Sequence, residues 1–113
     1  MKFSISQNSG FHIVTLSGDV DLSSSPQARD AILQSLSKGH VMVDLSAVEY
    51  IDSSGVASLV EGYQTAKDRE VRFGLIGVSP SALLVLQLAH LDRVFTIHDS
   101  LDEAVVQEPL NES

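Results

Sequence analysis

The sequence contains no cysteine, and this absence excludes disulfide bonds, thiol catalysis and thiolate metal sites. Basic residues are also few: seven Lys and Arg stand against fifteen Asp and Glu, which gives a formal net charge of −8. Because nucleic acids and anionic lipid surfaces attract basic patches, this balance argues against both as direct partners. A basic protein partner stays open.

Long apolar runs are missing as well. The longest uninterrupted aliphatic run covers residues 82–86, which is far too short to span a bilayer. Met1 and Lys2 are followed by alternating polar and apolar residues, a pattern unlike that of a signal peptide. We therefore expect a cytoplasmic protein without direct membrane insertion.

The composition is that of an ordinary globular protein. Of the 113 residues, 43% are hydrophobic and 19% are charged, so the chain is long enough for one hydrophobic core but not for two. We expect one domain over residues 1–113, with its core at about 3–105 and a flexible tail at 109–113.

Hydrophobic periodicity predicts a strand-strand-helix start followed by three strand-helix units. The expected strands are residues 3–6, 11–16, 40–45, 72–76 and 94–97. The expected helices start after Ser25 as N-cap, at the turn of residues 52–55, after Ser79, and after Ser100, and the last one ends near Pro109. This order predicts an α/β domain with a mixed, mostly parallel five-stranded sheet and about four helices, in which the first hairpin adds one antiparallel edge strand.

The most informative stretch of the sequence is Ile51-Asp52-Ser53-Ser54-Gly55-Val56, where we expect an apolar strand to end and a helix to begin. The acidic stretch Gly18-Asp19-Val20-Asp21, which we expect to be a loop, follows the preceding strand. Carboxyl ends of neighbouring parallel strands meet at one edge of a sheet. We therefore expect five polar side chains to be neighbours there: Asp19, Asp21, Asp52, Ser53 and Ser54.

Enzymatic catalysis at this edge is not predicted. A serine nucleophile needs a nearby base and an oxyanion hole, and the glycine of a nucleophile elbow is missing where Asp52 and Ser53 precede Ser54. The four histidines are scattered through strands and helix ends. Asp19, Asp21 and Asp52 offer oxygen ligands that suit Mg²⁺, but short carboxylates more often cap turns. We predict no metal and no cofactor.

The serine pair has a structural and a regulatory interpretation. Asp52 or Ser53 can cap the following helix, a contribution of about 1 kcal/mol. A second exposed hydroxyl in the first turn is then available for modification. A phosphate there would meet the free N–H groups of the helix start. It would add about −1.5 to −2 charges beside Asp21 and Asp52, and so change what can dock.

Four patterns in order resemble the STAS domain, in particular the SpoIIAA-like anti-sigma factor antagonist family. Gly18-Asp19-Val20-Asp21 resembles that family's Gly-Glu-Leu-Asp turn, with Asp19 in place of Glu. Residues 43–46 followed by 50–55 resemble its central strand and phosphorylation motif, and residues 77–80 and 88–95 resemble its third-helix region. The resemblance covers about residues 3–105.

The resemblance implies a phosphorylation switch at Ser54. It implies that the free protein binds an anti-sigma factor, a GHKL-type serine kinase, and thereby releases a sigma factor for transcription. Phosphorylation would end this binding, and a PP2C-type phosphatase would reset it. The implied partner-binding residues are Asp19, Asp21, Asp52, Ser53, Gly55 and Val56. Together with the net charge, the resemblance predicts a monomer.

Two other roles are open to a STAS domain. STAS proteins also serve as non-enzymatic subunits bound to the ATPase of lipid-transporting ABC systems, and as stressosome-like scaffolds. The transporter subunits often carry Thr in this turn, so Ser53-Ser54 favours the switch. The sequence also lacks a glycine at residues 68–70, after the second helix, and we expect that helix to end by another geometry.

Overall fold

The computed structural model describes residues 1–109. The expected tail therefore lies outside the described residues, apart from Pro109. The strands are β1 (Lys2–Asn8), β2 (Phe11–Val20), β3 (Val41–Ile51), β4 (Phe73–Ile76) and β5 (Ile97–His98). The helices are α1 (Ser25–Leu36), α2 (Ser53–Arg69), α3 (Pro80–Leu88) and α4 (Leu101–Gln107), with a short 3₁₀ turn at Leu91–Arg93.

The sheet follows the order of the chain, β1-β2-β3-β4-β5. The pair β1–β2 is antiparallel and the other three pairs are parallel. The β1–β2 hairpin closes through Ser9 and Gly10, whose φ angles of 56° and 87° match a two-residue type I′ turn. The predicted α/β fold, with a mixed five-stranded sheet and four helices, is confirmed.

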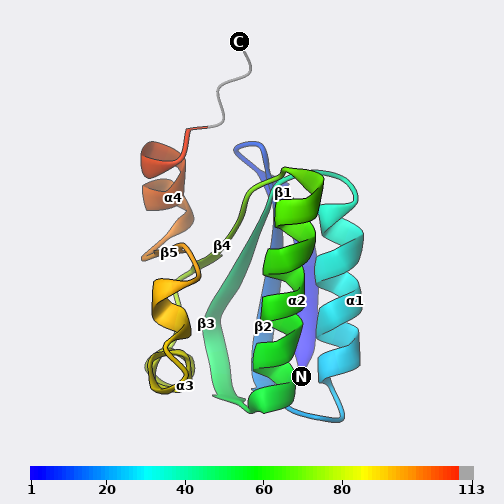
Figure 1. Ribbon diagram of the computed structural model, residues 1–113, viewed down its shortest axis with the longest axis vertical. Coiled ribbons are helices and arrows are strands. Elements are labelled where there is room, and N and C mark those ends of the chain that lie inside the picture. The colour runs from blue at the N-terminus through cyan, green and yellow to red at the C-terminus, as the bar shows by residue number, and fades with distance from the viewer. Residues whose placement is uncertain (110–113) are drawn as a thin grey trace.

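The helices form two unequal layers on the sheet (Figure 1). α1 and α2 lie side by side on one face and cover the main core, which includes Leu16, Ile32 and Leu59. On the opposite face, α4 buries Ala104 against a smaller cluster that contains Phe11 and Met42. Among residues 1–109, no helix is long and apolar enough to cross a membrane.

β2 and β3 are longer than the sequence predicted. Their pairing continues, with two register shifts, to Val20 opposite Ile51, so Gly18 and Asp19 lie in a strand and not in a loop. β4 pairs with β3 only as far as Asp44. Beyond that point Ser79 takes its place: its N–H donates to the Leu45 carbonyl (3.3 Å) and its hydroxyl to the Val48 carbonyl (2.7 Å).

One helix boundary and one strand boundary were also predicted incorrectly. α1 begins at Ser25 with Ser24 as its N-cap, one residue earlier than expected. The predicted strand at 94–97 shortens to Ile97–His98, because the chain turns through Leu91–Arg93. This turn places the Phe95 ring 5.9 Å from that of Tyr63 and 6.2 Å from that of Phe73. The chain thus buries the Phe95 ring where the sequence predicted the first part of a strand.

α2 ends through a left-handed residue, which corrects the expectation of another geometry. Glu70 adopts φ 58° and ψ 38°, the conformation that glycine usually supplies at this position. The Val71 N–H then donates to the Ala66 carbonyl (3.0 Å) and closes the helix end. α2 therefore ends with the left-handed backbone geometry that is common at helix C-termini, but with Glu70 in place of glycine.

Candidate functional site

The carboxyl ends of β2 and β3 bring the two predicted motifs together. Asp19 lies opposite Tyr50, and Val20 lies opposite Ile51. The Asp52 N–H donates to the Val20 carbonyl (3.2 Å) and ties the two chain segments together just before α2 begins. The resulting edge lies at one end of the molecule, next to the start of α2 (Figure 1).

Asp52 is the N-cap of α2. Its Oδ1 accepts hydrogen bonds from the N–H groups of Ser54 (2.9 Å) and Gly55 (3.1 Å), and the Val56 N–H donates to the Asp52 carbonyl (3.0 Å). Ser53 is therefore the first helical residue and not the cap. The N–H groups of residues 54–56, which were expected to be free for a phosphate, already have partners.

The Ser54 side chain is left unused by this arrangement. Ser54 donates its N–H to Asp52 and accepts the Ser58 hydroxyl at its carbonyl (3.2 Å). Among the described residues, its own hydroxyl has no hydrogen-bond partner, and the residue is partly exposed. Ser53 beside it is exposed. Both hydroxyls are accessible, and Ser54 is the one held within a capped turn.

Gly55 and Val56 face inward. A Cβ atom on Gly55 would lie 2.6 Å from Ile51 Cγ1 and 2.7 Å from the Val20 carbonyl oxygen, so no side chain fits there. Val56 is buried in the main core. These two residues hold the helix start against the strand ends, and the exposed surface of the site is made by their neighbours.

Asp21 organises the turn between β2 and α1. Its Oδ1 accepts from the Ser23 hydroxyl (2.8 Å) and from the N–H groups of Ser23 (3.1 Å) and Ser24 (3.1 Å). The Ser24 hydroxyl in turn donates to the Asp19 carbonyl (3.0 Å). These bonds, led by that of the Ser23 hydroxyl and opposed by partial desolvation, lower the pKa of Asp21 below its ordinary value of 3.8.

Two apolar side chains beside this turn were not predicted. Leu22 is 75% exposed and Tyr50 is 52% exposed, and they directly adjoin Asp21 and Ile51. Both side chains are therefore available for contact with another molecule. The isolation of Leu22 among polar residues could have identified it, whereas the exposure of Tyr50 depends on β3 extending beyond β4.

The histidines lie away from this edge. None of the four histidines lies in its turns: His12 and His40 are at the opposite ends of the strands, His90 immediately precedes the 3₁₀ turn, and His98 contacts Glu108. Within residues 1–109, no group of three potential ligand residues is close enough to hold a metal ion. Asp19, Asp21 and Asp52 share an edge but do not form such a group.

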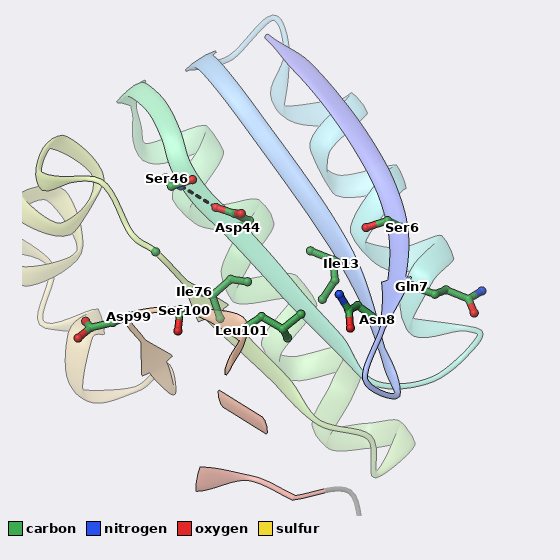
Figure 2. Close-up of a pocket in the computed structure, with 11 residues that line it drawn as sticks. Ser6, Gln7, Asn8, Ile13, Asp44, Ser46, Ile76, Asp99, Ser100 and Leu101 are labelled. Atoms are coloured by element: carbon green, nitrogen blue, oxygen red, sulfur yellow. Dashed lines mark hydrogen bonds between the residues drawn. The ribbon is translucent and has the colours of Figure 1, made fainter. Parts of the chain in front are cut away.

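A pocket of about 440 Å³ lies elsewhere, on the face of the sheet that α4 partly covers. Figure 2 shows Asp44 and Ser46 of β3, Asn8 of β1 and Asp99 around it, with the bond from the Ser46 N–H to Asp44 (2.9 Å). None of the predicted site residues lines this pocket. The candidate site is thus distinct from this pocket, and its residues that are not buried lie on a surface that suits contact with another protein.

The amino-acid sequence matches one protein family over most of its length. The family, described as STAS domain, matches residues 2–104. The anti-sigma F factor antagonist of Paenibacillus polymyxa is 23% identical over 110 residues, which cover 95% of this chain and 94% of that protein. The anti-sigma-B factor antagonist of Listeria monocytogenes is 23% identical over 86 residues, 74% of this chain and 75% of the relative.

Solved structures agree with this match. An anti-sigma factor antagonist from Mycobacterium paratuberculosis superposes with a TM-score of 0.85 at 27% identity, covering 94% of this chain and 92% of its own. SpoIIAA in its unphosphorylated form superposes with a TM-score of 0.78 at 20% identity, covering 97% of this chain and 100% of its own. Because SpoIIAA is only 20% identical, that comparison supports a shared fold alone.

Proposed function

The chain belongs to the STAS domain family, and from this premise we propose that it is an anti-sigma factor antagonist that is switched off by phosphorylation of Ser54. The observation that carries the proposal is the Ser54 hydroxyl. It is accessible and has no hydrogen-bond partner among the described residues. The turn around it is held by hydrogen bonds to Asp52 and from Ser58. A modifying enzyme can reach it without opening the helix.

The docking surface consists of the exposed or partly exposed residues around that hydroxyl: Asp19, Asp21, Leu22, Tyr50, Asp52, Ser53 and Ser54. Its carboxylates would face a basic patch on the partner, while Leu22 and Tyr50 would supply apolar contacts. The protein thus acts by binding and is itself the substrate of another protein's chemistry.

Phosphorylation would act through charge. The Asp52 carboxylate is held by two N–H groups, and the Asp21 carboxylate is held by Ser23 and Ser24, so neither is free to move away from a phosphate. A phosphoserine would add about −1.5 to −2 charges to this fixed acidic surface. A partner that binds the unmodified surface closely would then meet repulsion and lose contacts.

The partners follow from the family resemblance. We propose that the kinase is the anti-sigma factor itself, a serine kinase of the GHKL type, and that a PP2C-type phosphatase removes the phosphate. The unmodified protein would hold the kinase and so release a sigma factor. The accessible hydroxyl of the docking surface fits this role, for which we propose the cytoplasm as the location.

Substitutions at Ser54 test the switch. Ser54→Ala should bind the kinase at full strength and take up no phosphate, whereas Ser54→Asp should bind at least about tenfold more weakly, because a fixed negative charge replaces the hydroxyl. Binding is measured by titration calorimetry, and phosphate transfer by intact-protein mass spectrometry.

The adjacent serine gives the matched control. Ser53→Ala removes an exposed hydroxyl of the docking surface one position away but leaves the acceptor in place, so phosphate should still be transferred to Ser54 at saturating kinase. Transfer that persists in Ser54→Ala and disappears in Ser53→Ala would show that Ser53, and not Ser54, is the phosphorylated residue. Full-strength binding by Ser54→Asp would refute the electrostatic mechanism. Purification of the protein from its native cell with an ABC transporter ATPase and a permease, rather than with a kinase, would contradict the proposed role.

A further inference from the structure

We propose that β1 is a self-association edge, through which two copies of this chain pair in antiparallel fashion and join their sheets into one. The proposal goes beyond the regulatory site, because β1 carries none of the residues around Ser54. It concerns the backbone groups of one strand and the side chains that accompany them.

β1 is an outer strand with few features that would prevent pairing. In the sheet formed by residues 1–109 it is the end strand, with no other strand beyond it, as Figure 2 also shows. All seven of its residues are exposed, and its pairing with β2 has no register shift. Edge strands usually carry proline, several charges or a bulge that block association, and Lys2 is the single such residue here.

The phase of the hydrogen bonds determines which backbone groups are free. The two-residue turn at Ser9 and Gly10 makes Asn8 and Phe11 a hydrogen-bonded pair, and every second residue before Asn8 then bonds to β2 in the same way. The N–H and C=O groups of Phe3, Ile5 and Gln7 consequently point away from β2, toward the free edge.

These three residues are self-complementary. In an antiparallel pair centred on Ile5, Ile5 lies opposite Ile5 of the second copy, and Phe3 lies opposite Gln7. Each pair exchanges two hydrogen bonds, about six in all. On the other face of the strand Ser4 meets Ser6, and Lys2 meets Asn8. No two like charges face each other, although the chain as a whole carries −8.

The same register covers apolar surface. Phe3 is 47% exposed and Ile5 is 45% exposed, and both lie on the α1 side of the sheet, opposite the buried Leu16 and Val14. A groove of about 340 Å³ runs between Phe3 and the residues Gln27, Asp30, Ala31 and Gln34 of α1. The second copy would place its Ile5 and Gln7 next to Phe3 at this groove.

The geometry leaves both regulatory sites accessible. Antiparallel pairing of identical edges puts a two-fold axis perpendicular to the sheet, so α1 and α2 of both copies lie on the same face. The strands of the two copies then run in opposite directions. The two Ser54 turns lie at opposite ends of the joined sheet, so one dimer presents two independent docking surfaces. The proposed dimer is an alternative to the monomer that net charge and family resemblance predict.

Ile5→Lys tests the proposal, because it places two like charges face to face on the axis while substituting a half-exposed residue. The native chain should change from one to two subunits between low micromolar and near-millimolar concentration in sedimentation equilibrium. The variant should associate at least about tenfold more weakly. Circular dichroism verifies that it is folded.

Leu88→Lys is the matched control, since Leu88 is 74% exposed but lies on α3, away from β1. It should leave association unchanged. Amide exchange of the native protein gives the site: at high concentration the amides of Phe3, Ile5 and Gln7 should gain protection. A native chain that stays a monomer throughout, a dimer without this protection, or a dimer abolished by Leu88→Lys but not by Ile5→Lys would each overturn the proposal.

Discussion

Gly55 is the residue on which the position of the Ser54 hydroxyl depends most directly, because no side chain fits between α2 and the ends of β2 and β3. An added Cβ would contact a backbone oxygen, that of Val20, which is unable to rotate away as a side chain could. The start of α2 would have to shift, and Ser54 with it. The glycine of the Asp-Ser-Ser-Gly turn is therefore required by packing, whichever partner binds.

Gly55→Ala is expected to lower the free energy of unfolding by about 1–3 kcal/mol, the usual cost of overpacking a filled site. Urea denaturation measures this loss, and the amide shifts of Ser54 and its neighbours report the displaced turn. Ser53→Ala should stay within about 0.5 kcal/mol of the native protein, as an exposed substitution does. A Gly55→Ala variant of native stability would show that the helix start adapts freely.

Titration of Asp21 makes the free energy of unfolding depend on pH, and the direction of this dependence follows from its lowered pKa. Its pKa is lowered in the folded protein, so its contribution to stability is present above the ordinary value of 3.8 and is lost as the pH falls through the lower folded value. A carboxyl NMR titration should find the Asp21 midpoint below 3.8.

The Ser23 hydroxyl is the leading cause of this shift, and Ser23→Ala serves as the control. That variant should move the Asp21 midpoint upward, toward 3.8. A midpoint at or above 3.8 in the native protein would mean that the Asp21 turn is not formed in solution as the structure has it.

At the scale of the elements, the end of α2 contains an avoidable strain. Glu70 occupies the left-handed region, where a Cβ atom costs about 1–2 kcal/mol and glycine has no such penalty. Glu70→Gly should therefore raise the free energy of unfolding by about 0.5–1 kcal/mol after the greater entropy of unfolded glycine is subtracted.

Thermal and urea denaturation measure this gain, and a glycine elsewhere in α2 provides the comparison. Gln64 is exposed within the helix, so Gln64→Gly should destabilise by about 0.5–1 kcal/mol. If both glycine variants lose stability to the same extent, Glu70 is not in the left-handed conformation in solution.

The elements also show where sequence patterns stop being informative. The N-cap of α4 was predicted correctly, since the Ser100 hydroxyl accepts from the Glu103 N–H (3.2 Å), a local contact. α3 is mostly apolar in sequence, but Leu84 and Leu88 are 56% and 74% exposed while Leu86 is buried. A helix at the margin of the sheet buries one stripe, and its position at the margin is not encoded in its own residues.

For the whole molecule, strand-helix alternation was sufficient to predict the fold. The mixed sheet, its antiparallel edge and the adjacency of the Asp21 and Ser54 turns all follow from chain order and right-handed connections. The lengths of β2 and β3 do not, because residues 17–20 form a strand only through pairing with residues 47–51, far along the chain. The cap of α2 is different, because the bonds from the N–H groups of Ser54 and Gly55 to Asp52 are local, and the sequence left open only whether Asp52 or Ser53 would be the cap.

The turn that carries Ser54 has its shape only in the folded protein. The bond from the Asp52 N–H to the Val20 carbonyl and the contact of Gly55 with the same carbonyl both require β2, a segment some thirty residues earlier in the chain. A short peptide with the sequence of residues 50–56 would lack this shape. An enzyme that modifies Ser54 would then recognise a surface and not a linear motif, and unfolded or newly synthesised chains would escape it.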